Sequence, residues 1–326
     1  MTTLKNKKVL VTGGLGFIGS NLAIELVKEG AQVEIYDALL PDMGGNLFNI
    51  DPVKKEVQVT ISDLRDRNKI KKAIRGKDVI FNLAGTLSHV DSMEDPFFDL
   101  EVNCRAQLCL LEACRRFNEG VKIVFAGTRN QYGRAQYLPV DENHPLEPTD
   151  INGVNAIAGE KYHLMYDKVY GIRVVSLRMT NTFGPRHQMK HPKQGVLNWF
   201  LKQIMDGETV TLMGGGKQIR DINYIQDVCD ALILAAGSVA ADGQVYNLGG
   251  IPLSLLAFTK EAVHVFGRGN IKSIDFPKDR KNIEIGDYIA NFKKIKKELL
   301  WKPKTTIDDG ISKTFDYYRK YQKNYW

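Results

Sequence analysis

The chain has 326 residues, of which 43% are hydrophobic and 25% charged, and its formal net charge is +7. This length can bury a large core, and the composition is that of an ordinary soluble globular protein. No run of about eighteen apolar residues occurs and the first apolar segment begins at residue 8, so we expect a cytoplasmic protein that does not use a membrane. Because the lysines are dispersed, the basic charge indicates attraction of anionic phosphates rather than a nucleic-acid partner.

The first motif along the chain is a glycine-rich turn between a strand predicted over 8–12 and a helix predicted over 17–29. Three glycines at three-residue spacing form it, namely Gly13, Gly16 and Gly19. Such glycines let the backbone approach a pyrophosphate, which the positive end of the helix attracts. A second strand, over 32–36, leads into Asp37, whose carboxylate can bind a ribose 2′-hydroxyl and would repel a 2′-phosphate. The segment therefore predicts a dinucleotide site that prefers NAD to NADP.

Short apolar runs alternate with helical patterns through most of the remaining chain. Further strands are predicted over 57–61, 78–83, 122–125, 173–177 and 244–248, and further helices over 96–117, 155–170 and 196–205. This alternation predicts an α/β fold, a Rossmann doubly wound parallel sheet with helices on both faces. We expect an NAD-binding domain over 1–178, to which the chain returns near 220–248, and a smaller, mainly substrate-binding lobe over 179–326.

The cysteines and the paired histidines do not indicate a metal site. The four cysteines, which lack a C-x-x-C spacing, are Cys104, Cys109, Cys114 and Cys229. We expect them to be buried free thiols. His187 and His191 are four residues apart, but Pro185 and Pro192 bracket them and disfavour a helical pair of ligands, so no metal is expected.

Ten segments in a constant order carry a resemblance that covers nearly the whole chain. They are TGGLGFIG (12–19), DLRD (63–66), NLAG (82–85), SHVDSMEDP (88–96), GTRNQYG (127–133), GVNAIAGEKY (153–162), NTFGPR (181–186), RDINYIQDV (220–228), YNLGG (246–250) and WKP (301–303). With these segments the chain resembles the extended short-chain dehydrogenase/reductase family, specifically its NAD-dependent nucleotide-sugar epimerases and dehydratases. The resemblance implies NAD as cofactor and a nucleotide-diphosphate sugar as substrate.

The resemblance also implies roles for individual residues. For the cofactor these are Gly13, Gly16, Phe17, Ile18 and Gly19 at the pyrophosphate, Asp37 at the adenosine ribose, Asp63 and Leu64 at the adenine, Leu83, Ala84 and Gly85 at the middle, and Met179 and Thr180 beside the nicotinamide. Asn181, Arg220 and Arg280 match family positions that contact the nucleotide diphosphate, for which an arginine fork is apt. His89, in the loop after NLAG, is a further candidate for reaching the substrate.

The catalytic positions depart from the family pattern. In the family a Tyr removes the proton of the sugar C4 hydroxyl, a Lys four residues later lowers the pKa of that Tyr, and a Ser or Thr shares the hydrogen bond. In this chain Thr128 occupies the hydroxyl position, Asn152 the Tyr position and Ala156 the Lys position. An amide cannot take a proton from a hydroxyl, and alanine can do neither job, so the usual base is missing.

Three explanations of this loss stay open. Another residue acts as the base, the candidates being His89, Asp91, Tyr132, His187 and His191. Ala156 is an engineered replacement of a lysine. Or the protein binds NAD and a nucleotide sugar with little or no turnover.

We expect an NAD-dependent enzyme of the epimerase/dehydratase type that oxidises its substrate transiently at sugar C4. Epimerisation is favoured, because dehydratases place an Asp-Glu pair directly after the Thr and this chain has Arg129 and Asn130 there. The alternative is a catalytically silent protein that binds NAD and nucleotide sugar. Family members dimerise through the helices that correspond to 96–117 and 155–170, so the resemblance implies a homodimer.

Overall fold

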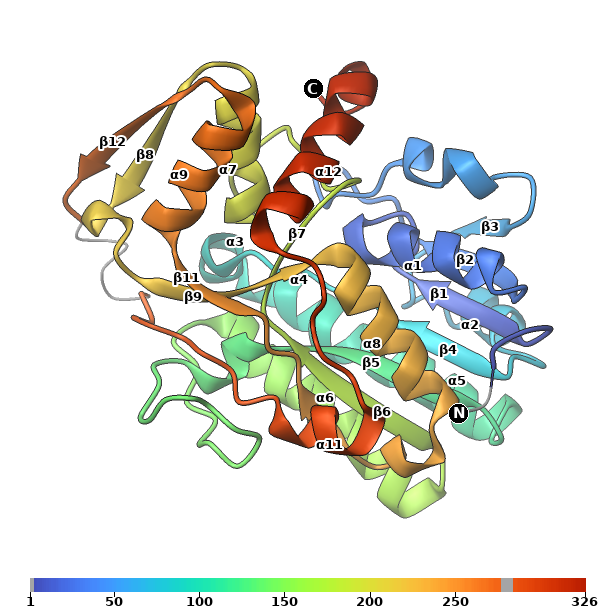
Figure 1. Ribbon diagram of the computed structural model, residues 1–326. Coiled ribbons are helices and arrows are strands. Elements are labelled where there is room, and N and C mark those ends of the chain that lie inside the picture. Colours follow the sequence, from blue (N-terminus) through green and yellow to red (C-terminus); the bar gives the residue numbers. More distant parts are fainter. Residues whose placement is uncertain (1–2, 277–283) are drawn as a thin grey trace.

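The centre of the computed structural model, which describes residues 3–276 and 284–326, is a seven-stranded sheet in the order β10-β6-β5-β4-β1-β2-β3 (Figure 1). Every neighbouring pair of these strands is parallel. The strands are β1 (Lys8–Thr12), β2 (Gln32–Asp37), β3 (Gln58–Ile61), β4 (Val79–Asn82), β5 (Lys122–Thr128), β6 (Arg173–Met179) and β10 (Val245–Asn247). This order confirms the doubly wound parallel sheet, and its strand order reverses between β1 and β4, where such sheets bind ligands.

Helices cover both faces of the central sheet. On one face lie α1 (Phe17–Lys28) and α8 (Ile225–Gly237), and on the other lie α2 (Arg67–Ala73), α5 (Ala106–Phe117) and α6 (Ile151–Tyr170). Alternate residues of β1 face opposite sides, so Val9 and Val11 pack in the first core and Leu10 in the second. Burial on both faces explains why the strands appear in the sequence as continuous apolar runs.

The second half of the chain builds two small sheets beside the carboxyl edge of the large one. One is three-stranded, with β11 (Ile251–Ser254), β9 (Ile219–Tyr224) and β7 (Asn181–Phe183), and the other pairs β12 (Asn270–Ile274) with β8 (Thr209–Met213). The accompanying helices are α7 (Val196–Met205), α9 (Leu255–Phe266), α11 (Lys293–Leu299) and α12 (Ile307–Tyr321). Of this half, α8 and β10 pack with the central sheet (Figure 1), while the division at residue 178 stays a prediction.

Two helices differ by more than one residue from their predicted bounds. The pattern over 96–117 forms three consecutive pieces, α4 (Pro96–Leu100), a π-helical turn η2 (Glu101–Arg105) and α5. The helix predicted from residue 155 begins four residues earlier as α6, because the side chain of Asp150 accepts a hydrogen bond from the Gly153 amide and caps it. It ends at Gly171, whose φ of 71° is left-handed. Positions 152 and 156 therefore lie on the first turns of a capped helix.

The C-terminal residues of the chain reach back to its N-terminal part. After α12, the Tyr325 hydroxyl donates a hydrogen bond of 2.6 Å to Asn49 Oδ1. Asn49 in turn donates to the carbonyl of Leu15, at 2.8 Å, within the glycine-rich turn. Tyr318 of α12 donates to the carbonyl of His187 at 2.8 Å. Hydrogen bonds thus join residues near both ends of the chain.

The four cysteines are free and buried, as expected. In the described part of the chain, none of the helices combines the length and the apolar character that crossing a membrane requires.

Candidate active site

A cavity of about 1070 Å³ runs along the carboxyl edge of the central sheet and continues to α7 and β8. Nineteen of the predicted site residues line it: Gly13, Gly16, Phe17, Ile18, Gly19, Asp37, Asp63, Leu64, Leu83, Ala84, Gly85, His89, Thr128, Asn152, Ala156, Met179, Thr180, Asn181 and Arg220. The other predicted residue, Arg280, lies outside the described residues. Residues that are far apart in the sequence are thus brought to one place, although their individual roles remain predictions.

The glycine-rich turn has the geometry that a bound pyrophosphate requires. Gly13 has a φ of +65°, and a Cβ on Gly19 would stand 2.2 Å from the Gly13 carbonyl oxygen, so the close approach of turn and helix needs glycine. No side chain caps the N-terminus of α1, whose cap residue is Gly16. The first amides of this helix therefore keep capacity for an anionic ligand in the cavity.

Asp37 stands at the end of β2 with both carboxylate oxygens fixed by backbone. Oδ2 accepts from the Leu15 amide at 2.9 Å and Oδ1 from the Leu39 amide at 2.8 Å. Burial raises the pKa of Asp37, and these two amides act in the opposite direction. Each oxygen keeps a free lone pair, as a ribose hydroxyl would need.

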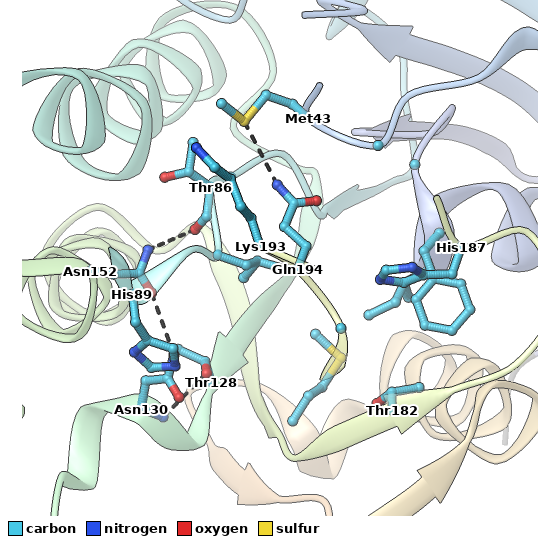
Figure 2. A pocket seen from close by; sticks show the side chains of 18 of the residues that line it. Met43, Thr86, His89, Thr128, Asn130, Asn152, Thr182, His187, Lys193 and Gln194 are labelled. Carbon is cyan, nitrogen blue, oxygen red and sulfur yellow. Dashed lines mark hydrogen bonds between the residues drawn. The ribbon is translucent and has the colours of Figure 1, made fainter. Parts of the chain in front are cut away.

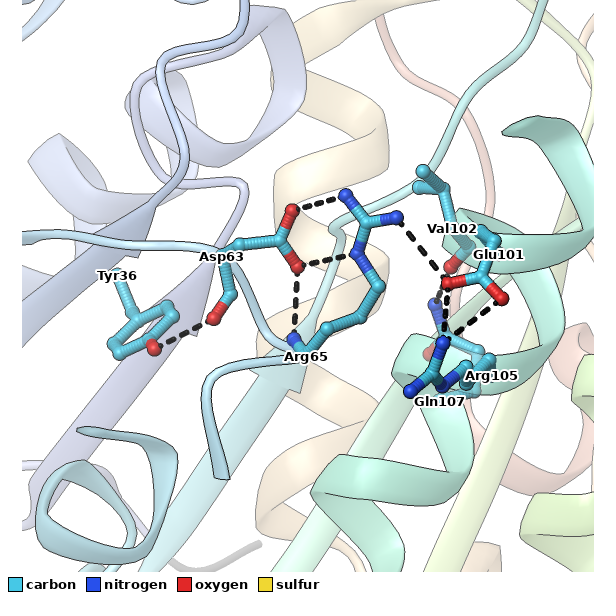
Figure 3. Close-up of polar contacts among 7 residues, drawn as sticks. All are labelled: Tyr36, Asp63, Arg65, Glu101, Val102, Arg105 and Gln107. Carbon is cyan, nitrogen blue, oxygen red and sulfur yellow. Dashed lines mark hydrogen bonds and ion pairs between the residues drawn. The ribbon is translucent and has the colours of Figure 1, made fainter. Parts of the chain in front are cut away.

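Asp63 lines the cavity as a paired carboxylate (Figure 3). Arg65 binds it through Nη2 at 2.6 Å and Nε at 2.9 Å, and extends to Glu101 at 3.4 Å. The pKa of Asp63 is lowered, and the largest cause is the side-chain hydrogen bonding from Arg65 to its carboxylate. The Tyr36 hydroxyl donates to the Asp63 carbonyl at 2.9 Å. Arg65, which the sequence analysis did not single out, thus fixes the orientation of the carboxylate predicted to meet the adenine.

Asn152, at the predicted Tyr position, is committed to the protein itself. It is 1% exposed, and its Nδ2 donates to the carbonyl of Thr86 at 2.8 Å (Figure 2). The same nitrogen donates to Asp99 Oδ2 at 3.0 Å. Its Oδ1 accepts a 3.5 Å hydrogen bond from Asn130 Nδ2. Ala156 follows one turn later on the cavity wall and carries no polar group. Neither position supplies an acid or a base.

A buried carboxylate explains why an amide suits position 152. Asp99 is 2% exposed and accepts hydrogen bonds of 2.8–3.0 Å from four neutral side chains. The donors are Thr86, Asn103, Asn152 and Asn155. Burying a carboxylate is costly unless donors surround it, so Asn152 contributes to a structural network. The sequence analysis missed this network, because Asn152 and Asn155 are more than 50 residues from Asp99 in the sequence.

The contacts of two candidates, Tyr132 and Asp91, exclude them as the catalytic base. The Tyr132 hydroxyl donates to Asn247 Oδ1 at 2.7 Å and accepts from Arg178 at 2.7 Å, and burial raises its pKa to about 12. Tyr132 is also fully buried and is not among the residues that line the cavity. Asp91 lines no part of the cavity and forms an ion pair of 2.8 Å with Lys193.

Two histidines of the loop after β7 line the cavity away from Thr128. His187 is 7% exposed, its Nδ1 lies 2.6 Å from the Gln188 carbonyl, and burial lowers its pKa to about 4. His191 has Nε2 3.0 Å from the Asp42 carbonyl. Figure 2 shows His187 well apart from the group formed by Thr128, Asn130 and Asn152. These contacts assign both histidines to the cavity wall.

His89 differs from the other candidates. It opens the short helix α3 (His89–Glu94), its side chain is 37% exposed, and its Nδ1 forms a hydrogen bond with Asp150. Among the described residues, no hydrogen bond to its Nε2 occurs.

Two arginines, Arg220 and Arg129, line the cavity. Arg220 pairs with Glu284 at 2.5 Å and donates to the carbonyls of Ile219 and Gly286. The side chain of Arg129, on the turn η3 (Arg129–Tyr132), forms no hydrogen bond with the described residues, and its Nη1 is buried. Its guanidinium lies 5.4 Å from the centroid of the Tyr288 ring. Burial lowers its pKa to about 10. A half-buried arginine whose Nη1 is buried without a hydrogen-bond acceptor fits an anionic ligand.

Asn181 offers a second unsatisfied polar group in the same cavity. Its Oδ1 is buried without a hydrogen-bond partner in the described residues. Thr180 beside it is anchored, because its hydroxyl donates to the Asp221 carbonyl at 2.7 Å. The strand β7 thus presents a free acceptor to a ligand from a fixed backbone.

Comparison with known proteins places the whole chain among sugar-nucleotide enzymes. Residues 10–314 match the family described as GDP-mannose 4,6-dehydratase. A putative UDP-glucose 4-epimerase of Methanocaldococcus jannaschii is 31% identical over 95% of this chain and 97% of that protein.

Solved structures agree over nearly the full length. A UDP-glucose 4-epimerase of Thermus thermophilus in complex with NAD is 31% identical with a TM-score of 0.85, over 96% of this chain and 99% of that one. A dTDP-glucose 4,6-dehydratase of Streptomyces venezuelae, also with NAD bound, is 25% identical with a TM-score of 0.88, over 97% and 98%. The chain therefore belongs to the GDP-mannose 4,6-dehydratase family, among the nucleotide-sugar epimerases and dehydratases of the extended short-chain dehydrogenase/reductase type.

Proposed function

We propose that this protein is an NAD-dependent enzyme that oxidises a nucleotide-diphosphate sugar transiently at C4, with epimerisation as the net outcome. The observation that carries the proposal is that one cavity joins the glycine-rich turn and Asp37 to Thr128 and to Arg129, whose Nη1 has no hydrogen-bond partner among the described residues. A cofactor site and an anion site thus flank a hydroxyl group.

The residues present fit NAD. The uncapped N-terminus of α1 would receive the pyrophosphate, and the fixed oxygens of Asp37 would receive the adenosine ribose. The carboxylate of Asp37 would repel the phosphate of NADP at the same place. When bound, NAD supplies the oxidising capacity that the side chains of a protein lack.

The diphosphate of the substrate would lie at the other end of the cavity. Arg220 is largely neutralised by Glu284, so we assign the main cationic contact to Arg129, with the free Oδ1 of Asn181 available to a ribose or sugar hydroxyl. This assignment adds Arg129 to the residues expected from the sequence. The sugar would then meet Thr128, whose Oγ1 accepts from the Asn130 amide at 3.2 Å and can still donate.

Epimerisation is preferred because the residues next to Thr128 cannot carry out an elimination. Arg129 and Asn130 both line the cavity, and neither side chain exchanges a proton readily. A dehydratase needs an acid and a base at this place to remove water from the sugar. The structure puts no carboxylate in this pair of positions.

A homodimer is part of the proposal. Large apolar side chains are exposed along one side of α6 and on the neighbouring α4: Val154, Met165 and Val169, with Phe97 and Leu100. Val169 is 60% exposed and Phe97 77%. Exposed apolar side chains grouped in this way are typical of an interaction surface, and they lie on the helices that the family uses to dimerise.

The proposal is tested by cofactor content and turnover of the purified chain. We expect NAD to be released on denaturation, and at least one sugar from a panel of UDP-, GDP-, dTDP- and CDP-sugars to change stereochemistry at C4. The Gly19→Ala variant is the matched negative control, since its Cβ would collide with the Gly13 carbonyl in the glycine-rich turn. Ala156→Lys, assayed in parallel, tests whether a lysine at that position is needed.

Turnover by the wild-type chain would show that neither a lysine at 156 nor a tyrosine at 152 is required. Turnover by Ala156→Lys alone would mean that this sequence is a disabled form of an enzyme. If both proteins bind nucleotide sugar and neither converts any member of the panel, the proposed function is wrong and a binding role replaces it.

A further inference from the structure

The start of α3 and the cap of α6 bring together a histidine that lines the cavity and a buried carboxylate. His89 Nδ1 is hydrogen-bonded to Asp150 Oδ2, and the two residues are 61 positions apart in the sequence. The Asp150 side chain is 3% exposed, and its other oxygen, Oδ1, accepts from the Gly153 amide at 2.7 Å. Both oxygens of Asp150 therefore accept hydrogen bonds. Asp150 fixes the His89 ring, and the first turn of α6 fixes Asp150.

This contact determines which nitrogen of His89 can accept a proton. Burial alone would raise the pKa of Asp150, but the contacts with His89, the Gly153 amide and the charge of Arg129 together lower it. An ionised Asp150 only accepts hydrogen bonds, so the neutral imidazole must carry its proton on Nδ1. Nε2 is left with a free lone pair, and no hydrogen bond from the described residues occupies it.

The first turn of α6 and the turn η3 connect the surroundings of this pair with those of Thr128. Asp150 lies two residues before Asn152, Asn152 accepts from Asn130, and the Asn130 amide donates to Thr128 Oγ1. Figure 2 shows the His89 ring in the same group as Thr128, Asn130 and Asn152. His89, Thr128 and Asn152 all line the cavity, and the His89 side chain is 37% exposed. A sugar hydroxyl placed at Thr128 would thus meet an imidazole that faces the cavity.

We propose that His89 is the catalytic base of this enzyme and that Asp150 is its positioning residue. The inference rests on the proposed function and deepens it, because it supplies the group that Asn152 and Ala156 cannot. His89 Nε2 takes the proton of the sugar C4 hydroxyl: the O–H bond breaks, the N–H bond forms, and the electron pair left on oxygen becomes the second C–O bond. The hydrogen on C4 leaves with two electrons to NAD, and both transfers reverse when the 4-keto group is reduced.

Charged groups around the pair support this role. The positive charge of Arg129 in η3 helps to keep Asp150 ionised. On the helix of His89 itself, Asp91 is paired with Lys193, so its charge is largely balanced. Glu94, at the other end of the same helix, also lines the cavity, but Asp150 is the carboxylate hydrogen-bonded to the ring and so stabilises the imidazolium formed in the reaction.

Asp150→Asn is the sharpest variant that the site offers. The asparagine oxygen can still accept from the Gly153 amide and cap α6, because Asn and Asp are comparable caps. Its NH₂ group would then face His89 Nδ1 and donate to it, which forces the ring proton onto Nε2. The fold is kept while the base is blocked. His89→Ala removes the base, and His264→Ala is the matched control, since His264 is exposed on α9 and does not line the cavity.

The experiment combines a measurement that needs no turnover with one that does. Nitrogen-15 NMR of the histidine rings in the full chain reports which nitrogen of His89 is protonated, and titration with UDP-glucose follows binding. Rates with the panel sugars are then measured as a function of pH for the wild-type chain and the three variants. We expect Nε2 of His89 to be unprotonated in the wild-type chain and protonated in Asp150→Asn.

For His89→Ala and Asp150→Asn we expect kcat to fall by about 10²- to 10⁴-fold with little change in KM, as for loss of a general base. Added imidazole should restore part of the rate of His89→Ala and none of the rate of Asp150→Asn, and the acidic limb of the pH profile should disappear in His89→Ala. A His89→Ala enzyme with wild-type kcat, or a wild-type Nε2 that carries the proton, overturns the role of His89 and leaves the proposed function intact. A wild-type chain that binds UDP-glucose but converts no sugar of the panel overturns both.

Discussion

Replacing Glu160 by glutamine should weaken the support beneath the candidate active site. Glu160 of α6 and Arg178 of β6 form a buried ion pair at 2.5 Å, with side chains 0% and 4% exposed. Ser176 and Gln131 also donate to Glu160, and Arg178 donates to the hydroxyl of Tyr132. Burial acts to lower the pKa of Arg178, but Glu160 and Tyr132 raise it above its ordinary value. In Glu160→Gln the guanidinium stays charged and loses its counter-ion.

The magnitude follows from the burial of the pair. Removing one partner of a buried ion pair costs about 3–5 kcal/mol. Unfolding entropy is about 2.1 cal/mol/K per residue, so for 326 residues 1 kcal/mol corresponds to about 1.5 °C in Tm. We therefore expect a Tm about 5–7 °C below that of the wild-type chain, measured by differential scanning calorimetry. Turnover should fall as well, because Gln131 and Tyr132 lie on the same turn as Arg129.

Two controls separate this effect from a general loss of charge. Asp316→Asn removes a carboxylate from a pair at 3.4 Å whose side chains are about 70% exposed, and should shift Tm by about 1 °C or less. The double variant Glu160→Met/Arg178→Met removes both charges and should recover much of the lost stability. A Tm of Glu160→Gln within about 1 °C of the wild-type value would refute the reasoning.

Three further predictions concern binding and assembly. Arg129→Met should weaken UDP binding by about tenfold or more, from loss of about 1.5–3 kcal/mol of charge-assisted hydrogen bonding, while leaving NAD binding unchanged in calorimetry; equal UDP affinity in both proteins would contradict the assignment. Asp37→Asn should lower the affinity for NAD by about tenfold, because one backbone amide would face an NH₂ group. It should also reduce the preference for NAD over NADP in fluorescence titrations, because the charge that repels the NADP phosphate is lost; an unchanged preference would speak against Asp37 as the ribose ligand. Val154→Glu/Val169→Glu should elute as a monomer where the wild-type chain elutes as a dimer in size exclusion with light scattering, and a monomeric wild-type chain would remove the homodimer from the proposal.

The features that local sequence predicts well are those with a local cause. The strand over 8–12 and the helix that follows are visible because an apolar run, three glycines and a helical pattern are adjacent, and the observed β1 has the predicted bounds. The apolar pattern predicts the start of α6 four residues too late. The reason is that Asp150 caps the helix through a side-chain contact with the Gly153 amide, which an apolar pattern does not reveal.

The chemistry of the site depended on contacts between distant segments and was harder to predict. The absence of a tyrosine and a lysine could be seen at positions 152 and 156, but the use of Asn152 by Asp99 could not, since 53 residues separate them. His89 was one of several candidates, and only its contact with Asp150, across 61 residues, distinguishes it. The sequence shows only that Arg129 stands where dehydratases have a carboxylate. That its Nη1 is buried without an acceptor among the described residues is a property of the fold.

Hydrogen bonds from Tyr325 to Asn49 and from Asn49 to Leu15 mean that the dinucleotide site is complete only after residue 325 has been synthesised. A ribosome that adds about 5–20 residues per second needs about 15–60 s to travel from residue 15 to residue 325. During that interval the glycine-rich turn has been synthesised but lacks the brace that Tyr325 provides. Capture of the cofactor should therefore follow synthesis of the chain rather than accompany it, and a fragment ending before residue 325 should hold NAD less firmly than the full chain.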